Sequence, residues 1–254
     1  MQILELKQRL REGHATLGAW LTVQSPMLVS AMVSLGFEWL AVDFEHGVFD
    51  MEQSQNIFIT VERYGALPLV RLPSADPYLA RRLLDAGAQG VLVPVVEDPE
   101  AFQGFIDHCL YKPHGRRGVG LSRCNRWGDD FKTYLHDFQP LIVAQIETKK
   151  GVRMADQIAA LPAVDALMLG PYDLSADLGI AGDFGNPRYQ EAAAKVLRAC
   201  LANGKAPGMH QVAPDEAALM TQLEQGFKFI AYGTDVLSMR SALQPGVERF
   251  QKLG

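Results

Sequence analysis

Short apolar runs recur along the whole chain, and segments with helical character separate them. Within each run the apolar residues follow one another instead of alternating with polar ones, which is typical of strands buried on both faces. The sequence therefore predicts parallel strands. They cover residues 17–23, 39–45, 67–72, 90–96, 141–147, 166–170, 205–209 and 228–233.

The intervening segments predict helices, because several have Pro, Asp or Asn near their first turn and Gly after their last. An amphipathic helix is also expected at the N-terminus. The other expected helices cover residues 26–35, 51–64, 77–86, 98–110, 149–160, 187–203, 214–225 and 235–251.

This alternation of strands and helices predicts an α/β fold, a (β/α)8 TIM barrel, as one domain over residues 1–254. An open doubly wound sheet is the main alternative. Such a sheet usually has a glycine-rich turn after its first strand, and residues 23–27 (VQSPM) have none. The longest irregular segment is expected at residues 111–138, where one loop is extended.

Composition argues against several classes of function. The net charge of −5 disfavours a nucleic-acid partner. No apolar run reaches the roughly 18 residues of a membrane helix, and the charged N-terminal segment is unlike a secretory signal peptide. Cys109, Cys124 and Cys200 form no Cys-x-x-Cys pair and predict free thiols in a reducing compartment. We therefore expect a cytoplasmic protein with no nucleic-acid or membrane partner.

Ionisable and polar residues gather where the expected strands end, which in a TIM barrel is the face that carries the chemistry. The opposite strand ends carry mostly Gly, Ala, Pro and short polar turns. This asymmetry predicts an active site at one end of the barrel. The residues at the carboxyl ends are Glu45, His46, Arg71, Gln145, Glu147, Gly170, Pro171, Tyr172, Asp173, His210, Thr234 and Asp235.

Glu147 and Asp173 follow neighbouring strands and together suit a hard divalent cation such as Mg²⁺ or Mn²⁺, which takes oxygen ligands. Zinc would prefer His or Cys, and the sequence has no cluster of those. Two alternatives remain open. Glu147 is equally compatible with a structural ion pair to Arg71, and Asp173 with an N-cap of a helix that begins at Leu174.

Three further acids predict basic partners. Asp43 and Glu45 share one face of a strand and would repel each other in a core of low dielectric, so at least one should have a cationic or hydrogen-bonding partner. Asp85 stands late in a helix, where its charge opposes the helix dipole. A basic partner such as His46 or an arginine is expected beside it, although His46 alone also suits a surface loop.

Seven motifs along the chain resemble the HpcH/HpaI aldolase family, from about Gly18 to the last helix. They are VDFEHG, LVRLP, LLDAGAQGVLVPVV, RGVG, QIET, LGPYDLSADLG and YGTD. These motifs are similar to those of class II pyruvate aldolases of the phosphoenolpyruvate/pyruvate barrel superfamily. The resemblance implies a metal-dependent enzyme that reversibly cleaves a 4-hydroxy-2-oxo acid, such as 4-hydroxy-2-oxoheptanedioate, into pyruvate and an aldehyde.

The resemblance also implies roles for individual residues. Glu147 and Asp173 would hold the divalent metal, with Co²⁺ as a candidate besides Mg²⁺ and Mn²⁺. Arg71 would stabilise the pyruvate enolate. His46, oriented by Asp85, would take the proton from the C4 hydroxyl.

On the substrate side the resemblance implies that Gln145 lies beside the metal and that Gly170, Pro171 and Tyr172 cradle the pyruvate carboxylate. Trp20 matches an aromatic residue near the aldehyde pocket. Members of the family form homohexamers, built as trimers of dimers, in which the C-terminal helix is exchanged between neighbours.

Other functions stay open at this point. A synthase or decarboxylase would use the same enolate, and a non-catalytic barrel could bind 2-oxo acids. A Schiff-base aldolase is disfavoured, because Lys149 and Lys150 fall at a charged helix start. His210 departs from the small or apolar residue expected there. The loop arginines, at positions 116, 117, 123 and 126, suit a solvated or interface loop, or one of them could bind an anionic aldehyde.

Overall fold

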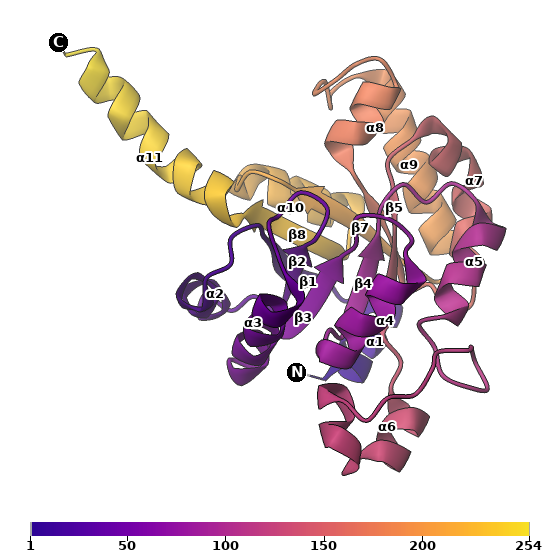
Figure 1. Ribbon diagram of the computed structural model, residues 1–254. Coiled ribbons are helices and arrows are strands. Elements are labelled where there is room, and N and C mark those ends of the chain that lie inside the picture. Colours follow the sequence, from indigo (N-terminus) through magenta and orange to yellow (C-terminus); the bar gives the residue numbers. More distant parts are fainter. Residues whose placement is uncertain (1, 254) are drawn as a thin grey trace.

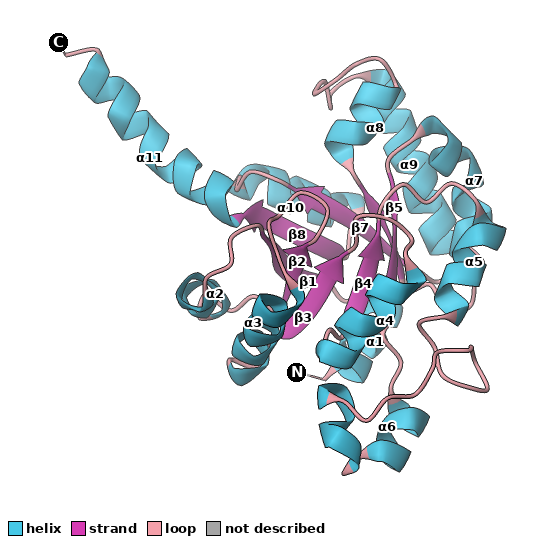
Figure 2. Ribbon diagram, in the orientation of Figure 1, coloured by secondary structure: helices cyan, strands magenta, loops and turns pink. Residues whose placement is uncertain are grey.

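The computed structural model describes residues 2–253, and within them eight parallel strands close into a barrel in chain order, with β8 pairing β1 (Figures 1 and 2). The predicted TIM barrel is confirmed. The strands are β1 (Thr16–Leu21), β2 (Trp39–Asp43), β3 (Leu67–Arg71), β4 (Gly90–Val93), β5 (Leu141–Ile146), β6 (Ala166–Leu169), β7 (Ala206–Gln211) and β8 (Phe229–Thr234).

Helices surround the barrel, as the alternating pattern predicts (Figure 2). Gly87 and Gly226 end two of them in the left-handed conformation that glycine adopts without steric cost. The predicted helices are α1 (Ile3–Arg11), α2 (Pro26–Val33), α3 (Met51–Arg63), α4 (Pro77–Ala86), α5 (Pro99–Asp107), α7 (Lys149–Ala159), α9 (Pro187–Ala202), α10 (Glu216–Gln225) and α11 (Asp235–Gln251).

Two short helices were not expected, η1 (Arg123–Gly128) and α6 (Phe131–Asp137), and a third, α8 (Pro171–Asp177), begins earlier than the helix considered from Leu174. The expectation of an irregular segment over residues 111–138 was therefore partly wrong. Each of these helices has at most two turns, too few for an apolar period to emerge from the sequence.

Apolar side chains pack in two concentric layers, one inside the barrel and one between the strands and the helices. Inside the barrel Trp39 stacks on Phe229 with ring centroids 4.2 Å apart. A Cβ atom at Gly18 would collide with the Trp39 ring, so only glycine fits there. Leu6 and Leu10 of α1 belong to the same inner layer, and α1 thereby closes the amino-terminal end of the barrel.

The inner side chains become polar at the carboxyl ends of the strands. Alternate residues of a strand point inward, so each polar residue at the barrel mouth stands two positions after an inner residue of the layer below. Asp43 follows Ala41, Arg71 follows Leu69, Gln145 follows Val143 and His210 follows Gly208. The apolar floor thus carries a ring of polar groups, all of them buried.

Helix α11 extends away from the barrel (Figure 1) and exposes apolar side chains, among them Leu243, Val247 and Phe250. It starts at the barrel mouth, where the Asp235 carboxylate accepts hydrogen bonds from the backbone N–H of Thr22 and Val23 at 2.8 and 2.9 Å. Among residues 2–253, none of the helices has the length and apolar character needed to cross a membrane.

Candidate active site

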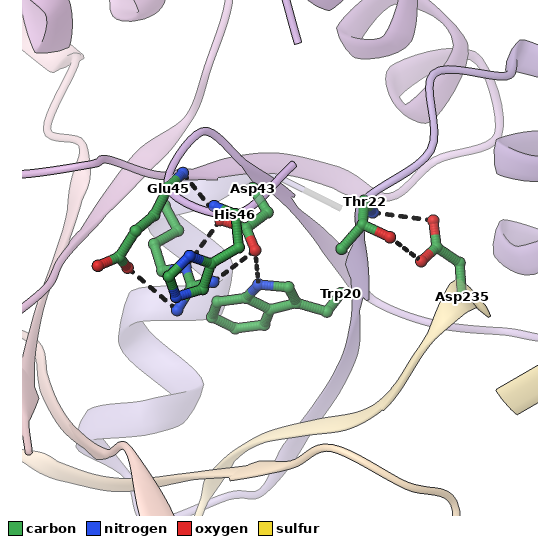
Figure 3. A network of polar contacts seen from close by, with 7 residues as sticks. Trp20, Thr22, Asp43, Glu45, His46 and Asp235 are labelled. Atoms are coloured by element: carbon green, nitrogen blue, oxygen red, sulfur yellow. Dashed lines mark hydrogen bonds and ion pairs between the residues drawn. The ribbon is translucent and has the colours of Figure 1, made fainter. Parts of the chain in front are cut away.

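Asp43 and Arg71 form a buried ion pair at the barrel mouth, where the pairing of β2 with β3 places them side by side. Arg71 Nε donates to Asp43 Oδ1 at 2.9 Å, and Nη2 contacts Oδ2. The Trp20 indole N–H also donates to Oδ2, at 3.2 Å (Figure 3). The backbone N–H groups of Glu45 and His46 donate to Oδ1 at 3.0 and 3.2 Å. The carboxylate therefore fixes the guanidinium.

The pKa values of the two carboxyl groups that contact Arg71 shift in opposite directions. Burial acts to raise the pKa of Asp43, but the hydrogen bond and charge of Arg71 outweigh it and hold that pKa below its usual value. Glu45 Oε2 lies 3.2 Å from Arg71 Nη1, yet burial raises the pKa of Glu45. The predicted cationic partner of the Asp43–Glu45 pair is confirmed, and it is Arg71.

Glu147 follows β5 and is only 4% exposed. Its Oε1 accepts a hydrogen bond of 2.7 Å from the Val95 backbone N–H, and a Cβ atom at Gly170 would collide with its Oε2. Burial, together with the charges of Asp173 and Glu45, raises the pKa of Glu147 to about 7, against the opposing effects of the Val95 hydrogen bond and the charge of Arg71. The glycine thus leaves room for a carboxylate in a site with excess negative charge.

Asp173 lies in the first turn of α8, whose N-cap is Gly170, so the alternative in which Asp173 caps a helix starting at Leu174 was wrong. The alternative ion pair between Glu147 and Arg71 was also wrong, because Arg71 pairs instead with the two acids of the VDFEHG motif. The negative charge of Asp173 nevertheless contributes to the raised pKa of Glu147.

Two carboxylates, those of Glu147 and Asp173, are the candidates for holding a divalent cation. Glu45, Glu147 and Asp173 influence one another electrostatically, and Arg71 is the cation that acts on both glutamates. Across residues 2–253 the structure has no group of three or more His, Cys, Asp and Glu side chains arranged to hold a metal. Two carboxylate ligands would leave other coordination positions to water or substrate, as Mg²⁺ usually requires.

His46 lies in the turn after β2, and its charge acts on Glu45 (Figure 3). Asp85 lies in α4, where its Oδ1 accepts a hydrogen bond of 2.6 Å from Arg117 Nη2. The expected basic partner of Asp85 is therefore confirmed as an arginine. Within the described part of this one chain no hydrogen bond or ion pair joins Asp85 to His46, and their pairing stays a prediction.

Side-chain partners within the chain are present for Arg117, Arg123 and Arg126 of this loop. Arg117 is buried, with its guanidinium 4.5 Å from the Tyr111 ring centroid and 5.4 Å from that of Phe138. Arg123 pairs with Glu62. Arg126, which is largely exposed, pairs with Asp130 at 2.9 Å in the i,i+4 arrangement. The burial of Arg117 contradicts a solvated position for that residue, whereas the exposed Arg126 suits a solvated loop; binding of an anionic aldehyde stays a prediction.

The residues expected on the substrate side lie at or just after the carboxyl ends of β1, β5 and β6. Gln145 is 1% exposed. Gly170, Pro171 and Tyr172 form the turn from β6 into α8. Tyr172 is exposed and meets Phe184 edge to face, with centroids 5.1 Å apart. Trp20 is fully buried, and Arg71 Cζ lies 5.1 Å from the centroid of its ring.

Sequence reasoning missed the contacts that two residues, Val95 and His210, make at the site. Val95, which donates to Glu147, has a φ of 51°. A β-branched residue is rarely found in this left-handed region, so the backbone strain is tolerated where it aims an N–H at the acid. No sequence signal could have identified it. His210 was noticed only as a departure, and it stacks on Trp20 with centroids 4.1 Å apart and an 18° interplanar angle.

His210 should lower stability in acid. Burial, with the charge of Arg71, lowers its pKa from 6.5 to about 3, so between these values the unfolded chain binds a proton that the folded one does not. Its contribution to the free energy of unfolding should fall by about 1.4 kcal/mol per pH unit below pH 6.5. Urea denaturation at pH 7 and pH 5 should therefore show about 2 kcal/mol less pH-dependent loss for His210→Phe than for the natural chain. Equal losses would show that the imidazole is already charged in the folded protein.

Known proteins resemble this chain over most of its length. The family model described as HpcH/HpaI aldolase/citrate lyase matches residues 16–242. A hydroxypyruvate/pyruvate aldolase of Chromohalobacter salexigens is 36% identical over 94% of this chain and 95% of its own length. A 2-keto-3-deoxy-L-rhamnonate aldolase of Escherichia coli is 32% identical over 96% of this chain and 92% of its own.

A solved structure from Burkholderia cenocepacia, described as an HpcH/HpaI aldolase/citrate lyase family protein, superposes with a TM-score of 0.90 at 32% identity. The match covers 97% of this chain and 99% of that one, so the likeness extends over the whole barrel. Since the family model spans most of the chain and relatives above 30% identity cover nearly all of it, this chain belongs to the HpcH/HpaI aldolase/citrate lyase family.

Proposed function

We propose that the protein is a divalent-metal-dependent aldolase that reversibly cleaves a 4-hydroxy-2-oxo acid to pyruvate and an aldehyde. The observation that carries this proposal is the arginine held by Asp43 at the same barrel mouth as the Glu147–Asp173 carboxylates. Relatives at 36% and 32% identity are named as aldolases, which supports the same reaction class. The reverse direction, addition of pyruvate to an aldehyde, uses the same groups.

Each charged residue has a distinct task in this proposal. Glu147 and Asp173 would hold the cation, with Mg²⁺, Mn²⁺ and Co²⁺ as candidates. When bound, the cation would act as a Lewis acid on the 2-oxo carbonyl. Arg71 supplies a fixed positive charge to the oxygen that becomes negative when the C3–C4 bond breaks. Because Asp43 already holds the guanidinium, no reorganisation is needed as that charge develops.

Proton transfer falls to His46, since histidine is the side chain that most often transfers protons in enzymes, and His46 stands in the turn after β2 with its backbone N–H on Asp43. It would accept the proton of the C4 hydroxyl during cleavage and return it during addition. Asp85 would orient it. Gln145 and the turn of Gly170–Tyr172 would bind the pyruvate portion, and Trp20 would border the aldehyde portion.

We also propose that the protein assembles as a homohexamer, a trimer of dimers, in which α11 is exchanged between neighbouring copies. The exposed apolar residues of α11 support such an exchange, because an exposed apolar stripe is typical of a surface that another chain covers. The proposed location of the protein is cytoplasmic, which suits the buried free thiols of Cys109 and Cys200.

The test of the proposed function is release of pyruvate from a 4-hydroxy-2-oxo acid, measured with lactate dehydrogenase and NADH. We expect release with Mg²⁺ or Mn²⁺, its loss on adding EDTA, and its recovery with excess cation. Cleavage that persists after complete metal removal would contradict the proposed mechanism. Metal-dependent binding of pyruvate without cleavage of any such acid would instead identify a binding protein.

A further inference from the structure

His210 is a buried polar residue whose hydrogen-bonding capacity the chain itself does not use. It points inward from β7 at the barrel mouth and is 8% exposed. Among residues 2–253 its Nε2 atom has no hydrogen-bond partner. The imidazole ring stacks on the Trp20 indole, with ring centroids 4.1 Å apart.

An unpaired buried imidazole needs an explanation. Leaving a buried polar group without a partner costs about 1–3 kcal/mol, and an apolar ring of similar size would make the same stack without that cost. The cost is recovered when a bound molecule supplies the missing partner. A half-turn of the ring about its Cβ–Cγ bond preserves the stack and exchanges each nitrogen with a ring carbon, Nδ1 with Cδ2 and Nε2 with Cε1, so the ring can present a nitrogen on either edge.

The position of His210 limits which part of a substrate it can meet. His210 and Arg71 both lie against the Trp20 indole, at 4.1 and 5.1 Å from its ring centroid. On the proposed function, Arg71 stands at the enolate oxygen, next to the carbon that attacks the aldehyde. The group within reach of His210 is therefore on the first atoms beyond the aldehyde carbonyl.

The charge of His210 limits the chemistry of that group. Burial and the neighbouring Arg71 keep the imidazole neutral at physiological pH, with Asp43 the opposing charge. A neutral imidazole has one donor and one acceptor nitrogen, which match a hydroxyl group, and it has no charge to attract a carboxylate. An alkyl group would leave the nitrogen unpaired.

We infer that His210 is a specificity-determining residue that selects aldehydes with a hydroxyl group next to the carbonyl. This inference rests on the proposed function and goes beyond it by naming the class of aldehyde. Relative preference of this kind is large when a site contains a buried polar group, because the analogue without the hydroxyl leaves that group unsatisfied.

The experiment compares glycolaldehyde with propionaldehyde in metal-dependent addition to pyruvate. The two aldehydes have the same number of non-hydrogen atoms and differ by a hydroxyl in place of a methyl group. Because their intrinsic reactivities differ, the measured quantity is the ratio of their kcat/KM values in each variant. His210→Phe keeps an aromatic ring on Trp20 and removes both nitrogens, and His210→Leu provides a second apolar replacement.

Replacement of His210 by Phe or Leu should lower the glycolaldehyde-to-propionaldehyde ratio about tenfold or more, almost entirely through glycolaldehyde. Met209→Leu is the matched control on the same strand, since Met209 packs in the outer layer and the swap conserves volume. An unchanged ratio in both variants would overturn the inference. An equal fall for both aldehydes would also overturn it, and would reduce His210 to a support for Trp20.

Exchange of the pyruvate methyl protons with D₂O, followed by NMR, separates this inference from the proposed function. It reports enolate formation without any aldehyde and should be unaffected in His210→Phe. Absence of exchange in the natural enzyme with metal would refute the proposed function and this inference together. Normal exchange with an unchanged aldehyde ratio would overturn the inference alone.

Discussion

Replacing Arg71 with lysine should lower kcat by about 100- to 1,000-fold, the usual cost of removing one preorganised donor from a developing oxyanion. Lysine keeps the charge, but it lacks the planar guanidinium that donates from Nε and contacts Asp43 through Nη2 as well. The positive charge is then no longer fixed in direction. Pyruvate proton exchange should fall together with kcat, since both require the same enolate.

The lysine variant is more informative than alanine. Alanine would leave the Asp43 carboxylate buried without its cation, at a cost of about 3–5 kcal/mol that mixes folding with catalysis. Arg123→Lys is the matched control, because Arg123 pairs with Glu62 outside the barrel mouth. Full activity in Arg71→Lys would contradict the role given to the guanidinium and show that charge alone suffices.

Glu147→Gln should separate activity from stability, with opposite signs. Loss of one proposed carboxylate ligand should lower the affinity for the metal. Turnover should then fall about 1,000-fold, which corresponds to several kcal/mol of lost electrostatic stabilisation of the transition state. Metal-free stability should instead rise. The folded pKa of Glu147, about 7, exceeds its ordinary value of 4.5, so the charged form opposes folding as pH rises through this window. At pH 8 we expect a gain of about 1–3 kcal/mol.

The glutamine amide oxygen can still accept the Val95 hydrogen bond, so the shape of the site should be retained. Isothermal titration with Mn²⁺ and urea denaturation in EDTA measure the two effects. Glu97→Gln is the matched control: Glu97 accepts from Thr148 Oγ1 at 2.7 Å and interacts with Lys150 just beyond the same strand end. Unchanged Mn²⁺ affinity in Glu147→Gln would remove this residue from the ligand set.

The fold and the polar face were predictable because both depend on local pattern. Nearly continuous apolar runs such as residues 141–146 are typical of strands buried on two faces, and the chemistry of a TIM barrel lies at their carboxyl ends. Arg71 and Glu147 were selected as site candidates because they stand at the ends of expected strands.

Partners across the fold were harder to predict. The arginine beside Asp85 proved to be Arg117, from a loop 32 residues further along the chain. The strained Val95 that holds Glu147 has no signature at all, because a backbone N–H is available at almost any residue. Sequence patterns specify which side chains reach the mouth, whereas packing decides which of them meet.

The network around Asp43 also has a consequence for enzyme engineering. One carboxylate accepts hydrogen bonds from Arg71 on β3 and from the backbone of Glu45 and His46 in the turn after β2. The Arg71 guanidinium and the backbone that carries His46, the proposed base, are therefore attached to the same carboxylate, which the register of β2 with β3 places beside Arg71. Substitutions in the surrounding loops that leave this carboxylate in place should reshape the entrance for new substrates without releasing the guanidinium.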